Sequence, residues 1–125
     1  MHARGIDMII IHVMGGLGNQ LYQYALYEKF KFLGKEVKLD LFAYKGAQGE
    51  EKEWRSFELE WLDGVAYEIC TEDERRLFLD NSMKFIDRVR RKLIGRREKT
   101  VKEDADYMPE IFSMHNVYLY GFWNC

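Results

Sequence analysis

The first forty residues carry the clearest hydrophobic pattern of the chain. Residues 8–14 (MIIIHVM) are apolar and largely β-branched without alternation, which is typical of a parallel strand buried on both faces. Residues 21–33 have apolar side chains at helical spacing: Tyr22, Ala25, Leu26, Phe30 and Leu33. Gly34 follows and favours the end of a helix. Residues 37–41 (VKLDL) alternate as a second strand, so the order predicts a right-handed βαβ unit with parallel strands.

The pattern beyond residue 41 is less regular. Residues 42–62 begin as a polar, glycine-containing loop and continue as an aromatic-rich segment that fits either a short strand or a packed loop. Thr71, followed three residues later by Glu74, matches the capping box that begins many helices. We therefore expect helical structure from about residue 72 toward residue 97, with a break near residues 81–82.

The last third of the chain completes the expected fold class. The second half of the helical region has an apolar stripe, which is typical of a helix packed on a core: Phe85, Ile86, Val89, Leu93 and Ile94. Residues 98–106 resemble a charged linker, and residues 117–123 (VYLYGFW) an aromatic strand. Strands alternating with helices predict an α/β, Rossmann-like domain with a parallel sheet flanked by helices.

Composition and charge exclude several classes of protein. The chain has 125 residues, 47% of them hydrophobic, which fits one domain with a substantial core. A net charge of −2 argues against a nucleic-acid binder. The two cysteines, Cys70 and Cys125, indicate neither a disulfide framework nor a zinc site. Residues 1–7 lack the apolar core of a signal peptide, and no stretch is long enough to span a membrane. We therefore expect a short extension before a cytoplasmic domain of residues 8–125.

The loop between the first strand and the first helix is the best candidate for chemistry. In residues 15–20 (GGLGNQ), glycines let backbone N–H groups approach a ligand, and the helix N-terminus adds a partial positive charge that suits a diphosphate. The amides of Asn19 and Gln20 can bind phosphate or sugar hydroxyls. The candidate site residues are therefore Gly16, Gly18, Asn19 and Gln20, although glycines that merely form a tight turn fit the spacing equally well.

The dinucleotide-binding fold is one interpretation of this loop. Gly16 and Gly18 supply its G-x-G pattern, and Asp40 stands near the end of the second strand, where an acid would bind ribose. Leu21 replaces the third glycine, and this interpretation leaves the Asn-Gln pair unexplained. An NAD-binding module therefore stands as an alternative function, as does a non-enzymatic remnant domain without a ligand.

A different family explains more of the residues. Residues 14–25 (MGGLGNQLYQYA) closely resemble the opening motif of the family 11 glycosyltransferases, the α-1,2-fucosyltransferases. Residues 55–59 (RSFEL) resemble their R-x-F-x-L segment, and residues 118–123 (YLYGFW) resemble their Y-L-x-G-Y-[FW] strand. The three motifs follow the family order. The resemblance implies a GT-B enzyme of two Rossmann-like domains that moves fucose from GDP-fucose to a galactoside acceptor, with inversion and without a metal ion or other cofactor.

One motif of that family is missing here. The family's second domain carries an H-x-R-R-x-D motif, whose arginines suit the charge of the departing diphosphate. The arginine pairs of this chain lack a histidine at that spacing: residues 75–76, 90–91 and 96–97. We therefore expect a truncated N-terminal, acceptor-side half of a fucosyltransferase, without its GDP-fucose domain and inactive alone. The catalytic base stays unassigned, and the donor or cleft contacts are those of the glycine loop.

Three further features have two interpretations each. Residues 84–102 contain nine Lys or Arg, which fits peripheral contact with an anionic membrane or a solvated face of a packed helix; we expect the second. We expect His12 to be a hydrogen-bonded core histidine. Four aromatic residues fit sugar stacking or core packing, with core packing as the expectation: Trp54, Phe57, Trp61 and Tyr67.

Overall fold

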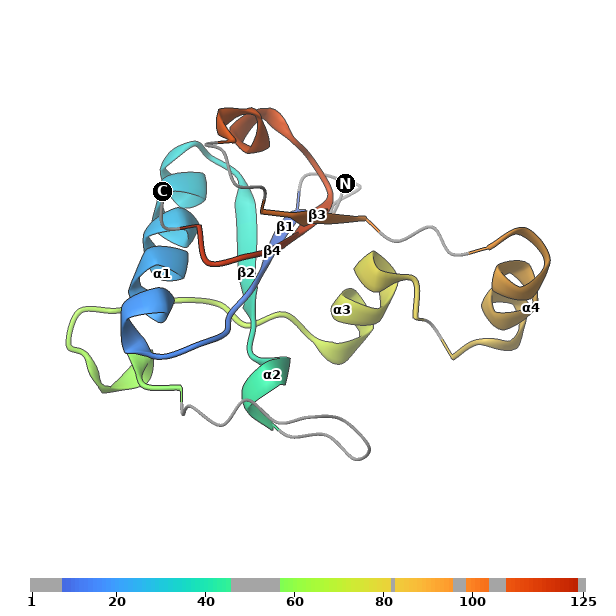
Figure 1. The fold of residues 1–125 in the computed structure, drawn as a ribbon, viewed down its shortest axis with the longest axis horizontal. Helices are drawn as coiled ribbons and strands as arrows, with labels where there is room; N and C mark the ends of the chain where they lie inside the picture. Colours follow the sequence, from blue (N-terminus) through green and yellow to red (C-terminus); the bar gives the residue numbers. More distant parts are fainter. Residues whose placement is uncertain (1–7, 46–56, 82, 96–98, 104–107, 124–125) are drawn as a thin grey trace.

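A four-stranded, all-parallel sheet forms the centre of the part of the chain that the computed structural model describes, residues 8–45, 57–81, 83–95, 99–103 and 108–123. Its strands run, in spatial order, β2 (Glu36–Asp40), β1 (Met8–His12), β4 (Val117–Tyr120) and β3 (Thr100–Lys102) (Figure 1). The α/β class and the parallel β1–β2 pair are confirmed. The predicted extension of residues 1–7 lies outside the described residues.

Alternate residues of β1 enter two separate cores. Ile9, Ile11 and, just past the strand, Val13 pack in a core with α1 (Leu17–Phe32), whereas Met8 and Ile10 pack with Phe78 of α3 (Glu72–Leu79). Met8 to Ile11 are therefore all buried, as the apolar run without alternation predicted. The strand ends at His12, two residues before the predicted boundary, and the glycine loop begins there.

Helix α1 covers one face of the sheet but buries a different stripe from the predicted one. It begins at Leu17, inside the glycine motif, and ends at Phe32. Tyr22, Ala25 and Leu33 are exposed, contrary to expectation. The buried residues of the helix are Gln20, Gln23, Leu26, Tyr27 and Phe30. The apolar pattern missed this face because two polar glutamines occupy its first two turns.

The predicted helical region of residues 72–97 contains two helices, α3 and α4 (Phe85–Ile94), with the expected break near residue 81. The capping box of α3 is confirmed: Thr71 Oγ1 accepts from the Glu74 N–H at 3.1 Å, and Glu74 Oε1 accepts from the Thr71 N–H at 2.8 Å. Helix α4 lies at the far end of the molecule from α1 (Figure 1) and has no buried residue, so the expected core packing of its stripe is wrong.

Short elements occupy the segments where the sequence pattern was weak. Helix α2 (Phe42–Lys45) starts the expected polar loop, and the 3-10 turns η1 (Leu59–Trp61) and η2 (Pro109–Ser113) border the α1 core. Strand β3 lies in the predicted charged linker and pairs with β4. Within the described residues, no helix combines the length and the apolar character that crossing a lipid bilayer requires.

Candidate functional site

The glycine loop lies at the carboxyl edge of the sheet, where the strand order changes direction. From β1 the chain passes through α1 to β2 on one side, and the later strands β4 and β3 lie on the other side of β1. In open parallel α/β sheets, ligands bind outside the carboxyl ends of the strands at such a switch point. Residues 13–16 and residues 121–123 follow β1 and β4 at this edge.

The three glycines of the loop occupy different structural environments. Gly15 has a φ of +83°, and a Cβ there would lie 2.8 Å from Asn19 Nδ2 and 3.1 Å from Phe122 Cε1, so this position requires glycine. Gly16 is extended and caps α1, its carbonyl accepting the Gln20 N–H at 2.9 Å. Gly18 is exposed in the first turn of α1, and a Cβ there would meet nothing within 4 Å.

The first turn of α1 is open to solvent at Gly18, whereas Gly16 just before it is buried. The first N–H groups of a helix have no partner within the helix and attract anions. The first turn of α1 contains no acidic side chain that would compete for them. Asn19 is half-buried, with its amide beside Gly15. Of the four predicted residues, Gly16, Gly18 and Asn19 thus line this turn.

Gln20, the fourth predicted residue, has a structural role. Its side chain is 0% exposed; Nε2 donates to the Gly15 carbonyl at 3.0 Å, and Oε1 accepts the N–H groups of Glu58 and Leu59 at 2.9 and 3.1 Å. Gln23 was not predicted as part of the site, yet its Oε1 accepts the Met14 N–H at 3.1 Å. The two glutamines hold the loop in place from beneath.

These hydrogen bonds join three segments that are far apart in the sequence. Gln20 belongs to residues 14–25 and binds the backbone of residues 58–59, while Gln23 Nε2 donates to the Gly121 carbonyl at 3.0 Å. Residue 121 belongs to the aromatic segment 118–123, whose Phe122 ring also lies beside Gly15. The described parts of residues 14–25, 55–59 and 118–123 therefore form one hydrogen-bonded unit. Residues 55–56 lie outside the described residues.

A second polar cluster occupies the same edge on the α3 face of the sheet. Tyr118 donates its hydroxyl to Asp40 Oδ2, and His12 Nδ1 lies 2.9 Å from the Tyr118 oxygen. The other Asp40 oxygen accepts the Phe42 N–H at 2.9 Å. Because a carboxylate oxygen can only accept, we assign the Nδ1 proton to His12, which makes Nε2 the acceptor nitrogen of the ring. His12 was predicted to be a hydrogen-bonded core histidine: the hydrogen bond is confirmed, but the side chain is half-buried rather than in the core.

This cluster borders a cavity of about 220 Å³. The Arg75 guanidinium stacks 3.7 Å from the Phe42 ring centroid, and the Tyr120 ring stacks on His12 at 4.6 Å. The residues lining the cavity come from strands β1, β3 and β4 and from helices α2 and α3: His12, Phe42, Arg75, Leu79, Thr100, Lys102, Tyr118 and Tyr120. A carboxylate, a phenol and an imidazole in series can orient the imidazole to accept a proton.

Burial and the Asp40 charge keep two nearby groups protonated. Desolvation, and then the negative charge of Asp40, raise the pKa of the Tyr118 hydroxyl. The same two causes raise the pKa of the Cys70 thiol to about 12. Neither group is a nucleophile at neutral pH, so the cluster is suited to hydrogen bonding and to proton transfer at His12.

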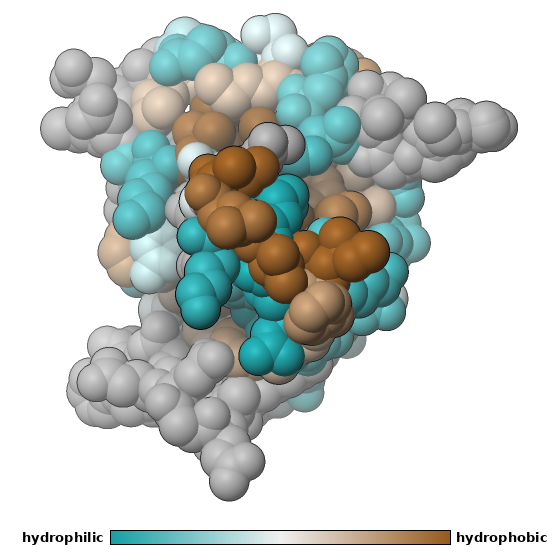
Figure 2. All heavy atoms as spheres, turned by 90° about the vertical axis from the view of Figure 1, so that its right-hand side faces the viewer, coloured by the Kyte–Doolittle hydropathy of each residue, from teal (hydrophilic) through white to brown (hydrophobic). Residues whose placement is uncertain are grey.

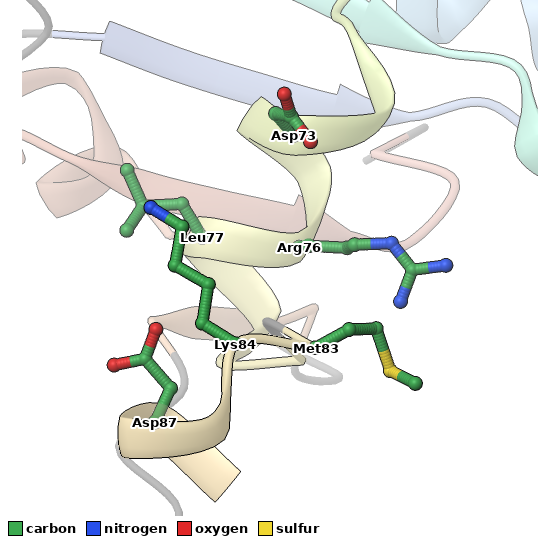
Figure 3. Close-up of a pocket in the computed structure, with 6 residues that line it drawn as sticks. All are labelled: Asp73, Arg76, Leu77, Met83, Lys84 and Asp87. Carbon is green, nitrogen blue, oxygen red and sulfur yellow. The ribbon is translucent and has the colours of Figure 1, made fainter.

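Another cavity, of about 600 Å³, lies between α3 and α4, and its lining contains no residue of the three motif-like segments. Figure 3 shows its lining: Asp73, Arg76, Leu77, Met83, Lys84 and Asp87. Of the aromatic residues considered for sugar stacking, Phe57 and Tyr67 pack on the α1 core, Trp61 is exposed, and Trp54 lies outside the described residues. Among the described residues, no three His, Cys, Asp or Glu side chains gather as a metal site.

Comparison of the chain with protein-family models, with curated proteins and with solved structures finds no match.

Proposed function

We propose that this chain forms the N-terminal, cleft-lining half of an α-1,2-fucosyltransferase of the GT-B type, which transfers fucose from GDP-fucose to a galactoside with inversion. The main observation behind the proposal is that the three segments resembling the family's motifs are hydrogen-bonded to one another. Segments that resemble this family at residues 14–25, 58–59 and 118–123 are joined through Gln20 and Gln23 into one unit at the carboxyl edge of the sheet.

In this proposal the glycine loop receives the charged part of the donor. The N-terminal turn of α1 offers N–H groups to a diphosphate, and the open space at Gly18 lets it approach the backbone. The Asn19 amide can bind a sugar hydroxyl or a phosphate oxygen. No metal ion is needed, since the proposal neutralises the diphosphate with backbone groups and with arginines of the H-x-R-R-x-D motif, which this sequence lacks.

The acceptor hydroxyl must lose a proton as the new bond forms. His12 stands at the same edge as the loop, and its hydrogen bond from Nδ1 to Tyr118 favours Nε2 as a proton acceptor. Within the proposal, His12 is therefore the candidate base of the described residues. Without the arginine motif, we expect weak GDP-fucose binding and no significant turnover by these 125 residues.

An NAD-binding module has less support from the geometry. That function requires a carboxylate at the end of β2 that can reach a ribose. Asp40 is only 3% exposed, and its two oxygens accept from Tyr118 and from the Phe42 N–H. A ribose would have to displace these bonds, whereas GDP-fucose binding at the glycine loop leaves them intact.

Calorimetric titration with GDP-fucose and, separately, with NAD tests the proposal. We expect GDP-fucose alone to bind, and Gly18→Ala to weaken it at least about tenfold, because the added methyl group occupies the approach to the backbone. Lys31→Ala, an exposed change in the last turn of the same helix, is the control and should bind normally. Binding of NAD instead would support the dinucleotide alternative, and binding of neither ligand would support a remnant domain.

A further inference from the structure

Helix α4 has an apolar stripe that no described part of the chain covers. Three side chains of the stripe are 76–78% exposed (Phe85, Ile86 and Leu93), and the fourth, Val89, is 38% exposed. At about 100° per residue these four side chains fall within an arc of about 100°. Figure 2, which views this side of the molecule, shows apolar side chains gathered across the face with hydrophilic residues beside them.

Ion pairs of two arginines outside the stripe determine which way it faces. Arg90 pairs with Asp80, and Arg91 NH1 lies 3.7 Å from the same carboxylate. Asp80 is buried at the end of α3, where it adopts the left-handed conformation that ends the helix. Because Arg90 and Arg91 turn toward α3, the stripe with Phe85 and Leu93 turns outward.

The charges beside the stripe favour one class of partner. Arg88 and Lys92 are exposed one helical turn apart along its edge, and the single acid of the helix, Asp87, lies on the side away from the stripe. An apolar helix face bordered by basic side chains is the arrangement that lies in the interface of an anionic membrane. There, long basic side chains reach the phosphates while their stems stay in the apolar layer.

A second copy of the chain fits this surface less well. Two α4 helices packed stripe to stripe would bring Arg88 and Lys92 beside basic residues of the other helix, which like-charge repulsion opposes. A helix of ten residues is also only about 15 Å long, and four exposed side chains offer much less than the ~800 Å² per partner of a stable interface.

We propose that α4 docks the protein on an anionic lipid surface, with Phe85, Ile86, Val89 and Leu93 in the boundary between headgroups and acyl chains and with Arg88 and Lys92 at the lipid phosphates. The cavity between α3 and α4 lies behind this stripe and takes no part in docking. Docking of α4 does not depend on the fucosyltransferase function, because no residue of the stripe belongs to the glycine-loop unit.

Co-sedimentation of the full chain with vesicles tests this. We expect binding to vesicles of phosphatidylglycerol and phosphatidylcholine in equal parts, and at least about tenfold weaker binding to phosphatidylcholine alone. Phe85→Ser should reduce the partition coefficient at least about fivefold. The matched control is Phe32→Ser, because Phe32 is 82% exposed near the end of α1 and its loss should change nothing.

A second pair of variants tests how much the basic side chains contribute to vesicle binding. Replacing Arg88 and Lys92 together by Gln should weaken binding to the anionic vesicles and remove most of its salt dependence. Replacing Lys29 and Lys31 of α1 by Gln changes the net charge equally and should have no comparable effect. Circular dichroism verifies that each variant stays folded. The proposal would be overturned if the chain did not bind vesicles, or if each variant and its control lost binding equally. A concentration-dependent dimer that Phe85→Ser dissociates would also overturn it.

Discussion

Two glutamine side chains of α1 bind backbone groups that the glycine loop and its neighbours expose. Gln20 and Gln23 together make five hydrogen bonds to the main chain of three segments. A glutamine amide is suited to this position because it donates and accepts at one end of an otherwise apolar stem. Burial without such partners would cost free energy, so these residues require the motif segments to be in place.

Gln20→Met tests this role at nearly constant side-chain volume. The variant removes the acceptor of the Glu58 and Leu59 N–H groups. The Gly15 carbonyl loses one donor but keeps the hydrogen bond from the Tyr44 hydroxyl at 2.7 Å. We expect the free energy of unfolding to fall by about 2–4 kcal/mol, measured by urea denaturation. Glu28→Met, an exposed change in the same helix, should alter it by less than about 0.5 kcal/mol. Equal stability of the two variants would show that the Gln20 hydrogen bonds contribute nothing.

At the residue scale, the site was only partly predictable. Gly16, Gly18 and Asn19 could be proposed as candidates because a glycine-rich turn before a helix can bind an anion, although a tight turn without a ligand fits the same spacing. The role of Gln20 could not, because a polar side chain next to a glycine loop suggests a ligand and its burial depends on the distant residues 57–59. Gln23 and Tyr118 were missed for the same reason, since their partners lie about 100 residues away.

Helices α3 and α4 differ in what stabilises them, although both are amphipathic. Helix α3 buries Phe78 against the sheet and begins with a complete capping box. Helix α4 has a stronger apolar stripe, but the structure holds it mainly by ion pairs to Asp80. The sequence pattern predicted both helices and their break. It could not show what covers each stripe, because periodicity reports only that one side is apolar.

The start of α3 should make stability depend on pH. Burial alone would raise the pKa of Glu74, but the hydrogen bonds from Lys38 at 2.9 Å and from Thr71 outweigh it and hold the pKa below its usual value. The hydrogen bond to Glu74 also raises the pKa of Lys38. A lowered carboxyl pKa stabilises the fold above the unfolded-state value of about 4.3, and the contribution is lost as pH falls through the folded-state pKa.

We therefore expect Glu74→Gln to lower the free energy of unfolding by about 0.5–1 kcal/mol at pH 7. The difference from the unmodified chain should shrink as the pH falls from about 4 through the lowered pKa of Glu74, because the carboxyl of the unmodified chain then becomes protonated. Glutamine keeps the capping interaction with Thr71, so the change isolates the charge. Urea denaturation at pH 7 and at a pH below about 4 measures the difference in the free energy of unfolding. Glu28→Gln is the exposed control. A difference independent of pH would contradict the proposed ion pair.

For the molecule as a whole, the βαβ unit and the parallel sheet were predictable because buried parallel strands and crossover helices have strong patterns. Strand β3 was not, because Thr100, Val101 and Lys102 form a strand only through pairing with β4. The sheet order, once known, puts the glycine loop, His12 and Asp40 at one edge. Hydrogen bonds of Gln20 and Gln23 join residues 58–59 and 121 to this edge, and the proposed function rests on that arrangement.

Amide-resolved nuclear magnetic resonance during titration with GDP-fucose tests the central claim most directly. We expect the amide signals of residues 15–19 to shift progressively, while those of α4 stay unchanged. In Gly18→Ala the shifts should be nearly abolished although the fold is kept, since alanine is favoured over glycine within a helix and has open space here. Unchanged loop signals, or shifts confined to the cavity between α3 and α4, would contradict a donor site at the glycine loop.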